Sequence, residues 1–162
     1  MKLYIVRHAH AGEPGDPRYP DDGLRPLDDE GKRRFSAVAR HLAKCGCQPD
    51  KIATSPLVRC RQTAEILAAA TAGKPELIEM GELAPGVDLG TMLHWSNQQD
   101  VASLAWVGHM PDVSQIVAQL IGDSLASIRF SKGAVACLDF DGDIAIGQGE
   151  LQWLVTAKAL GF

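Results

Sequence analysis

Arginine and histidine side chains lie just after apolar runs at three places in this sequence. Arg7 and His8 follow the run LYIV. Arg59 lies in the segment SPLVRCRQT, and His109 follows the run SLAWVG. A neutral imidazole can act as a nucleophile near pH 7, and a guanidinium binds phosphate through paired hydrogen bonds. These residue types together indicate an anion site suited to phosphoryl-transfer chemistry.

Arg59 is the most informative of these residues because of its position in a predicted helix. A cation in the first helical turn opposes the positive end of the helix dipole, which is unfavourable unless an anion binds there. Free backbone N–H groups and the guanidinium would both favour a phosphate at that point. Arg61 has Glu65 four residues later, and we interpret these two as a surface ion pair. We expect His10 at the rim of the site, without a catalytic role.

The segments that carry these side chains alternate between strand-like and helix-like patterns. Because such alternation is typical of a parallel sheet covered by helices, we expect an α/β three-layer sandwich. Its central sheet should be mainly parallel with an antiparallel edge, and helices should cover both faces. At this length we expect one domain over 1–162. The strands are predicted at 2–6, 51–55, 76–80 and 103–108, with two more in AVACLDFDG and QWLVTAK.

Helices are predicted from capping residues followed by apolar residues at helical spacing. A glycine or a change of composition marks their ends. The first helix is expected from an N-cap at Asp28 to Gly46, the second over 57–72 with Ser55 as N-cap and Pro56 at the first helical position, the third from Asp88, and the fourth with Pro111 at its first position.

The four candidate side chains all follow predicted strands. Taken singly, each has an ordinary explanation as a surface charge or as a histidine satisfied by its neighbours. The carboxyl ends of parallel strands form the ligand crevice of open α/β sheets, so we expect all four in one site. Residues 9–27 are rich in Gly, Pro and Asp and form a long connection. Long ordered connections are usually functional, and this one could cover the site.

Composition narrows the class of partner. The chain has 162 residues, 46% of them hydrophobic, a net charge of −4 and a pI of about 5.7. This balance argues against a general nucleic-acid or anionic-membrane partner. No apolar run approaches the roughly 20 residues of a membrane-spanning helix, and LYIV is too short for a signal peptide. We therefore expect a cytoplasmic protein. We also expect a monomer, since no predicted helix exposes an unpaired apolar stripe.

Metal binding has little support in the cysteine pattern. The four cysteines show no repeated C-x-x-C spacing, and His41, Cys45 and Cys47 lack a clear fourth ligand. No cysteine is followed by arginine at the sixth position, which excludes the C-x5-R phosphatase class. We therefore expect reduced thiols, no metal and no cofactor.

Longer stretches of the sequence carry a resemblance to a known family. LYIVRHA, ATSPLVRCRQTAE and WVGHMP resemble the histidine phosphatase superfamily, which has the fold of cofactor-dependent phosphoglycerate mutase. LRPLDDEG and GELAPGVD are most similar to its compact phosphohistidine phosphatase branch. The resemblance implies that His8 is the nucleophile and that the phosphate pocket is completed by three residues, Arg7, Arg59 and His109.

Three further positions relate to that family pattern. Ala9 follows the nucleophile where glycine is common, which adds only a methyl group. Glu82 lies in the region where the family usually has an acid. Arg25, in the long connection, could join the phosphate pocket. The expected site therefore comprises four main residues together with Glu82 and Arg25.

The segment CLDFDGD offers two competing interpretations. It resembles the aspartyl nucleophile loop of haloacid-dehalogenase-type phosphatases, but too few residues follow for the rest of that sheet. It also resembles a calcium loop, but Ile144 stands where glycine is needed. We interpret the segment as a turn between edge strands. Its calcium-loop positions would be Asp139, Asp141, Asp143 and Glu150.

The function expected from these observations is that of a metal-independent phosphatase that forms a phosphohistidine intermediate. A short chain with an open site suggests that its substrate is phosphohistidine on a protein, such as a histidine-phosphorylated phosphocarrier domain. One alternative is a small-molecule phosphomonoester phosphatase of the same fold. The other is a module that recognises phosphate without turnover.

Overall fold

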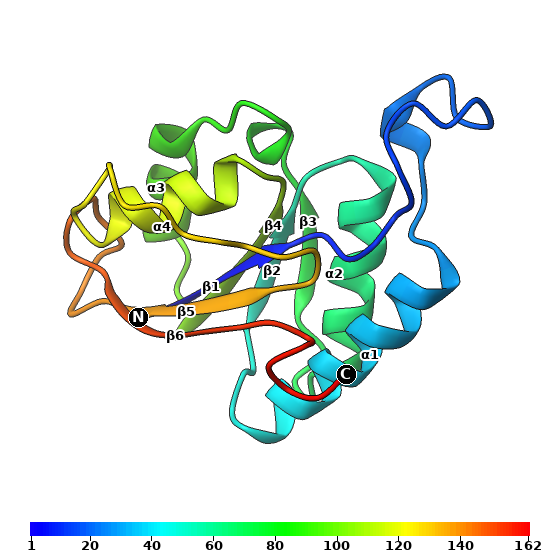
Figure 1. Ribbon diagram of the computed structural model, residues 1–162. Coiled ribbons are helices and arrows are strands. Elements are labelled where there is room, and N and C mark those ends of the chain that lie inside the picture. Colours follow the sequence, from blue (N-terminus) through cyan, green and yellow to red (C-terminus); the bar gives the residue numbers. More distant parts are fainter.

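Six strands form one mixed sheet in the computed structural model, which describes residues 1–162 (Figure 1). Their order across the sheet is β3-β2-β4-β1-β5-β6. The strands are β1 (Lys2–Arg7), β2 (Lys51–Thr54), β3 (Glu76–Glu79), β4 (Ser103–Gly108), β5 (Val135–Asp139) and β6 (Glu150–Val155).

Parallel pairing dominates the sheet. β1 pairs with β4, β4 with β2 and β2 with β3, all in parallel. β5 runs antiparallel to β1 and β6 antiparallel to β5, so the two C-terminal strands form an antiparallel edge. This arrangement confirms the expected α/β fold with a mainly parallel central sheet.

Two helical layers enclose the sheet (Figure 1). The helices of one layer pack against each other and share a core with Tyr4 and Val6 of β1. Those of the other layer share a core with Leu3 and Ile5, because successive strand residues face opposite sides. The first layer contains α1 (Asp29–Lys44) and α2 (Val58–Ala70), and the second contains α3 (Leu89–Asn97) and α4 (Asp112–Leu120).

Trp106 of β4 anchors the second layer. Its side chain is 1% exposed, and its Nε1 donates a hydrogen bond to Ser96 Oγ of α3 at 3.2 Å. Removing a buried aromatic side chain of this size costs about 3–5 kcal/mol. β4 is thereby fixed between the two layers, which fixes the position of the loop that follows it.

α1 begins and ends as its sequence predicts. The Asp28 side chain accepts a hydrogen bond from Gly31 N at 2.7 Å, which satisfies one free N–H of the first turn. Phe35, Val38 and Leu42 then face the sheet. Gly46, just past the helix, has φ 93°, a left-handed conformation that glycine adopts without strain.

The N-cap predicted for α2 is wrong, although its expected start near 57 is correct to within one residue. Leu57 is the N-cap residue and makes no side-chain capping bond, and the helix begins at Val58. Ser55, expected to cap it, instead lies 2.9 Å from His109 Nε2. Pro111 likewise precedes α4 as its N-cap instead of forming its first residue.

The ion-pair partner predicted for Arg61 of α2 is also wrong. Arg61 pairs with Glu79 of β3 at 3.4 Å, and not with Glu65. The neighbouring strand therefore competes successfully with the next helical turn for this cation. Arg61 is still a surface ion-pair residue.

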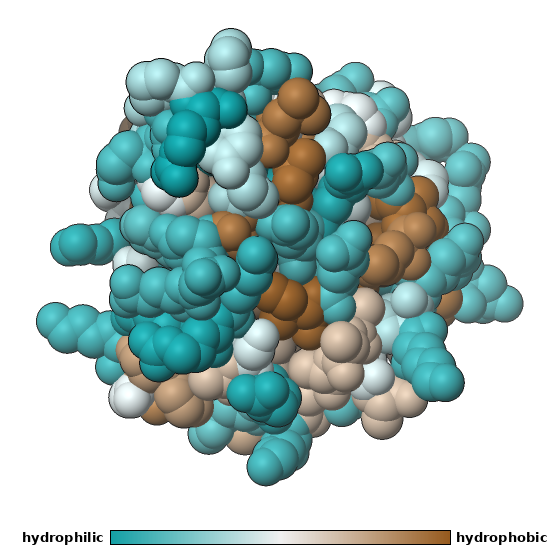
Figure 2. Space-filling view, turned by 90° about the vertical axis from the view of Figure 1, so that its right-hand side faces the viewer, coloured by the Kyte–Doolittle hydropathy of each residue, from teal (hydrophilic) through white to brown (hydrophobic).

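The surface on the side of the long 9–27 connection is mostly hydrophilic, with apolar atoms only in small separate areas (Figure 2). None of the helices combines the length and apolar character needed to cross a membrane.

Candidate active site

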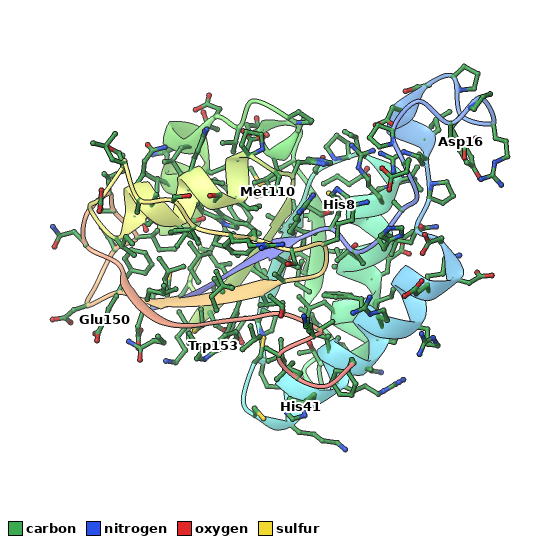
Figure 3. The ribbon with its side chains drawn as sticks, in the orientation of Figure 1. His8, Asp16, His41, Met110, Glu150 and Trp153 are labelled. Atoms are coloured by element: carbon green, nitrogen blue, oxygen red, sulfur yellow. The ribbon has the colours of Figure 1, made fainter.

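His8 and His109 are placed side by side by the pairing of β1 with β4. Arg7 is in register with Gly108. The residues that follow them, His8 and His109, therefore lie at the same end of neighbouring strands. His8 N donates a hydrogen bond to Gly108 O at 3.0 Å. The two imidazole rings lie 5.3 Å apart between centroids and are tilted by 57°. Figure 3 shows His8 at the end of β1, with Met110 nearby in the turn between β4 and α4.

A cavity of about 200 Å³ lies at these strand ends, and we call it the His8 cavity. Arg59, from the first turn of α2, reaches it because β2 lies beside β4. Five sequence-predicted residues meet in this cavity, and Glu82 is not among its lining residues. The cavity is lined by Arg7, His8, Gly12, Pro14, Asp22, Arg25, Arg59, Pro85, His109, Met110 and Lys132.

Glu82 lies half-buried in η2, a short 3-10 helix over Gly81–Leu83. Its backbone carbonyl accepts a hydrogen bond from Asp88 N at 3.0 Å. Pro85, three residues later, is the part of this segment that reaches the His8 cavity. A role for Glu82 as an acid therefore stays a prediction.

His8 is held in one tautomer by its own backbone neighbourhood. Its Nδ1 lies 2.8 Å from the carbonyl oxygen of Ala9, which can only accept, so Nδ1 carries the proton. Nε2 keeps its lone pair. Burial lowers the pKa of His8 to about 3, and the charges of Arg59 and Arg7 act in the same direction. The imidazole is therefore neutral and nucleophilic at pH 7.

His109 is also neutral at pH 7. Burial lowers its pKa to about 4, and Arg59 lowers it further, while Asp22 opposes the shift. Its Nε2 lies 2.9 Å from Ser55 Oγ and 3.4 Å from Cys60 Sγ. Sequence reasoning missed Ser55 as a site residue, because the Ser-Pro pair resembles an ordinary helix start.

The guanidinium groups of Arg7 and Arg59 are each held by one backbone carbonyl. Arg7 Nη1 donates to Phe130 O at 2.7 Å, and Arg59 Nη1 donates to Asp22 O at 2.9 Å. The Nε atoms of both arginines are buried and have no hydrogen-bond partner within the protein. Buried N–H groups are normally paired, so these two fit an anionic ligand with several acceptor oxygens.

Asp22 is a carboxylate inside the cavity that sequence reasoning missed. Its Oδ1 lies 2.8 Å from Arg25 Nε, and its Oδ2 lies 3.2 Å from Arg59 Nη1. The hydrogen bond from Arg25 is the main cause of its lowered pKa, so Asp22 is ionised at pH 7. The spacing of Asp22 and Arg25, three residues apart, is the signal that could have indicated the pair.

The backbone around His8 is tied to both helices of its layer. Ala9 N donates to Thr63 Oγ1 at 3.0 Å, and that hydroxyl donates to Arg59 O at 2.7 Å. Gly31 of α1 lies directly against the next residue, since a Cβ on it would stand 2.1 Å from His10 O. His8 and Arg59 are thus positioned by elements that are joined to each other by hydrogen bonds.

Two predicted features lie outside the cavity. The His10 side chain pairs with Asp28 and is 43% exposed, in keeping with a position at the rim. The tip of the 9–27 connection, marked by Asp16, projects away from the body of the protein (Figure 3). Only its two ends reach the His8 cavity, at Gly12 and Pro14 and again at Asp22 and Arg25.

The match to a known protein family decides the class of this site. The model of the histidine phosphatase superfamily, branch 1, matches residues 3–115. These residues run from β1 into the first turn of α4 and include Arg7, His8, Arg59 and His109. The chain belongs to the histidine phosphatase superfamily. This confirms the resemblance carried by the Arg7-His8 and His109 segments.

Individual members of the histidine phosphatase superfamily extend the similarity. An uncharacterized protein of Picosynechococcus is 43% identical over 118 residues, 71% of this chain and 70% of that protein. Phosphohistidine phosphatase SixA of Escherichia coli is 26% identical over 156 residues, 94% of this chain and 92% of that protein. A structure of SixA complexed with tungstate has a TM-score of 0.85 at 26% identity and covers 99% of both chains.

The superfamily membership and this close fold similarity support phosphatase activity for the chain.

The carboxylates and thiols outside the site form no candidate metal cluster. No group of three or more His, Cys, Asp or Glu side chains is arranged so that it could hold an ion. Cys45 Sγ contacts His41 Nε2 at 3.7 Å, whereas Cys47 is buried in the core. Asp139 pairs with Lys2 at 3.0 Å.

Proposed function

We propose that this histidine phosphatase removes phosphate from phosphohistidine on a protein, through a phosphohistidine intermediate at His8 and without a metal ion. Neutral His8 is available as the nucleophile. Guanidinium groups from three separate segments supply the positive charge that the transferring phosphoryl group requires. The proposed phosphate-binding residues are His8, Arg7, Arg59, His109 and Arg25.

In the first step His8 Nε2 forms a bond to phosphorus while the substrate's P–N bond breaks. The departing imidazole takes the electron pair of that bond and leaves neutral if its other nitrogen already carries a proton. Arg7 and Arg59 hold the equatorial oxygens, and their unpaired Nε–H groups gain acceptors. His8 then carries the phosphoryl group.

In the second step water attacks phosphorus and the bond to His8 Nε2 breaks. The electron pair returns to His8, and the water's proton passes to the neutral imidazole of His109 before it reaches solvent. The sum of both steps converts phosphohistidine and water to histidine and inorganic phosphate. The enzyme returns to its starting protonation state.

One observation favours phosphohistidine over a phosphate ester. Asp22 is the only carboxyl group that lines the His8 cavity, and its lowered pKa leaves it ionised at pH 7. An alkoxide leaving group needs a protonated acid beside it, whereas an imidazole that departs neutral does not. The similarity to E. coli SixA, a phosphohistidine phosphatase, supports the same substrate class. The tungstate complex of SixA supports oxyanion binding by this fold.

Competition between two substrates tests this proposal. A histidine-phosphorylated phosphocarrier domain should have a higher kcat/KM than an aryl phosphate ester. Arg59→Ala should lower both values by at least roughly tenfold, since it removes one of the guanidinium groups proposed to hold the phosphoryl oxygens. The control variant Arg61→Ala, which changes a surface cation on the same helix, should leave both near wild type.

The result that overturns the phosphohistidine assignment is also defined. If esters are the better wild-type substrates and Glu82→Gln abolishes their hydrolysis, Glu82 is a working acid. The protein would then be a small-molecule phosphomonoesterase. If neither substrate yields product while phosphate still binds, the protein is a recognition module.

A further inference from the structure

A second cavity lies beside the site, and we call it the flanking cavity. Its volume is about 400 Å³, within the range that holds a small ligand or several side chains. It is formed by four separate stretches of chain, and it is lined by Arg7, Ala9, His10, Gly31, Arg34, Phe35, Val38, Arg129, Phe130, Ser131, Lys132, Gly133, Thr156, Ala157 and Lys158.

The flanking cavity is strongly cationic. Five of the 16 Lys and Arg residues of the chain line it, and no Asp or Glu does. The whole protein has a net charge of −4, so this concentration is opposite in sign to the average. A cavity with charges of one sign focuses the field and attracts ligands of the other sign.

Most of this charge is only weakly neutralised by the protein itself. Arg34 pairs with Glu30 at 3.4 Å, and Lys132 lies 3.9 Å from a carboxylate of Glu13. Arg129 and Lys158 are exposed and have no carboxylate within ion-pair distance. These last two cations are therefore available to an outside partner.

The flanking cavity adjoins the His8 cavity. Arg7 and Lys132 line both. Arg7 Nη1 donates to Phe130 O, so the 129–133 segment, which carries Arg129 and Lys132, is attached to the site itself. A ligand with its phosphoryl group at His8 would therefore extend into the flanking cavity.

We propose that the flanking cavity binds an acidic segment of the substrate polypeptide, next to its phosphorylated residue. This inference rests on the proposed function for the identity of that residue. Arg129 and Lys158 are exposed at this cavity and would bind carboxylates of the segment, while Phe35, Val38 and Ala157 beneath them belong to the buried core. The chemistry recognised is thus a run of Asp or Glu residues.

Binding of an unphosphorylated peptide tests this surface independently of catalysis. The probe is a short fluorescent peptide with a run of glutamates, and its counterpart has glutamines in their place. Fluorescence anisotropy should show binding of the glutamate peptide to wild type and roughly tenfold weaker binding to Arg129→Ala/Lys158→Ala. The glutamine peptide should bind at least as weakly.

A matched variant separates a specific site from general attraction of charge. Arg33→Ala/Lys44→Ala removes two exposed cations of α1 that lie outside the cavity, with the same change of net charge. It should bind the glutamate peptide like wild type. Equal loss in the two double variants, or equal binding of the two peptides, would overturn the proposal, as would no binding to wild type.

Kinetics with phosphorylated peptides then separates this inference from the proposed function. Phosphohistidine in the glutamate context should be hydrolysed with a higher kcat/KM than in the glutamine context, and the Arg129→Ala/Lys158→Ala variant should remove that difference. Its hydrolysis of a small aryl phosphate should stay at the wild-type rate. If acidic peptides bind as expected but phosphohistidine is not hydrolysed, the proposed function fails and the binding surface stands.

Discussion

At the residue scale, one physical condition governs His8. Histidine near its ordinary pKa of about 6.5 is part protonated in the physiological range, and a protonated imidazole has no lone pair at Nε2. Burial removes water from His8, and neighbouring guanidinium groups disfavour a further positive charge. Burial is the main reason why His8 is neutral, and the cations proposed to bind phosphate act in the same direction.

This condition predicts how stability depends on pH. The pKa of His8 is about 3 in the folded state and about 6.5 when unfolded, so between these values only the unfolded state binds the proton. The stabilisation is present above pH 6.5 and is lost as the pH falls toward 3. From pH 6.5 to pH 5 the unfolding free energy of wild type should fall by up to about 2 kcal/mol more than that of His8→Gln.

Urea denaturation at a series of pH values measures this difference. His41→Gln, which changes an exposed histidine, serves as the control and should keep the wild-type slope. Parallel pH profiles of wild type and His8→Gln would show that His8 titrates normally in the folded protein. Its role as a permanently neutral nucleophile would then fail.

At the scale of elements, the site depends on the close approach of α1 to the end of β1. Gly31 allows the first turn of α1 to lie against the backbone of His10. The same segment is tied to α2 through Ala9 and Thr63. A shift of α1 would therefore be transmitted to His8, which directly precedes Ala9.

We expect Gly31→Ala to destabilise the fold and to slow turnover. The new Cβ would stand 2.1 Å from His10 O, so the backbone must move, at a cost of roughly 1–3 kcal/mol. Thermal unfolding and aryl phosphate hydrolysis measure the two effects. Gly73→Ala is the matched control, because its Cβ meets no atom within 4 Å, and it should be neutral or slightly stabilising. Wild-type stability and rate in Gly31→Ala would contradict the contact.

Local pattern was sufficient to predict most elements but not all of their starts. α1 has a capping aspartate, a regular apolar face and a terminal glycine, so its limits depend on nearby residues alone. The role of the Ser55 side chain depends instead on a distant residue, because it lies 2.9 Å from His109 Nε2. The convergence of the four side chains follows from a general rule for α/β sheets, whereas the order of the strands was not predicted from the sequence.

Asp22 shows why part of the site was not predictable. It begins η1, a 3-10 helix of three residues (Asp22–Leu24) that is too short to show a periodic pattern, and its partner Arg59 is 37 residues away in sequence. The flanking cavity has the same origin, since its cations come from β1, from α1, from the loop before β5 and from the C-terminal turn. Such contacts arise only when the whole chain is folded.

At the scale of the whole molecule, charge is distributed unevenly. The surface is acidic on average, yet both cavities are lined with arginine and lysine, and they share two of these residues. The average charge disfavours binding to nucleic acid, while the cavities attract anions at one place. A phosphorylated acidic partner would therefore be oriented before its phosphoryl group reaches His8.

The formation of a phosphoryl group on His8 is the central claim, and trapping it is the most direct test. Wild-type protein is mixed with a phosphohistidine substrate, quenched rapidly in alkali and digested for mass spectrometry. We predict an acid-labile, alkali-stable phosphoryl group on the peptide that contains His8, absent in His8→Gln, and unchanged when EDTA is present throughout. Turnover in wild type with no label on His8, or with the label on another residue, would contradict the account.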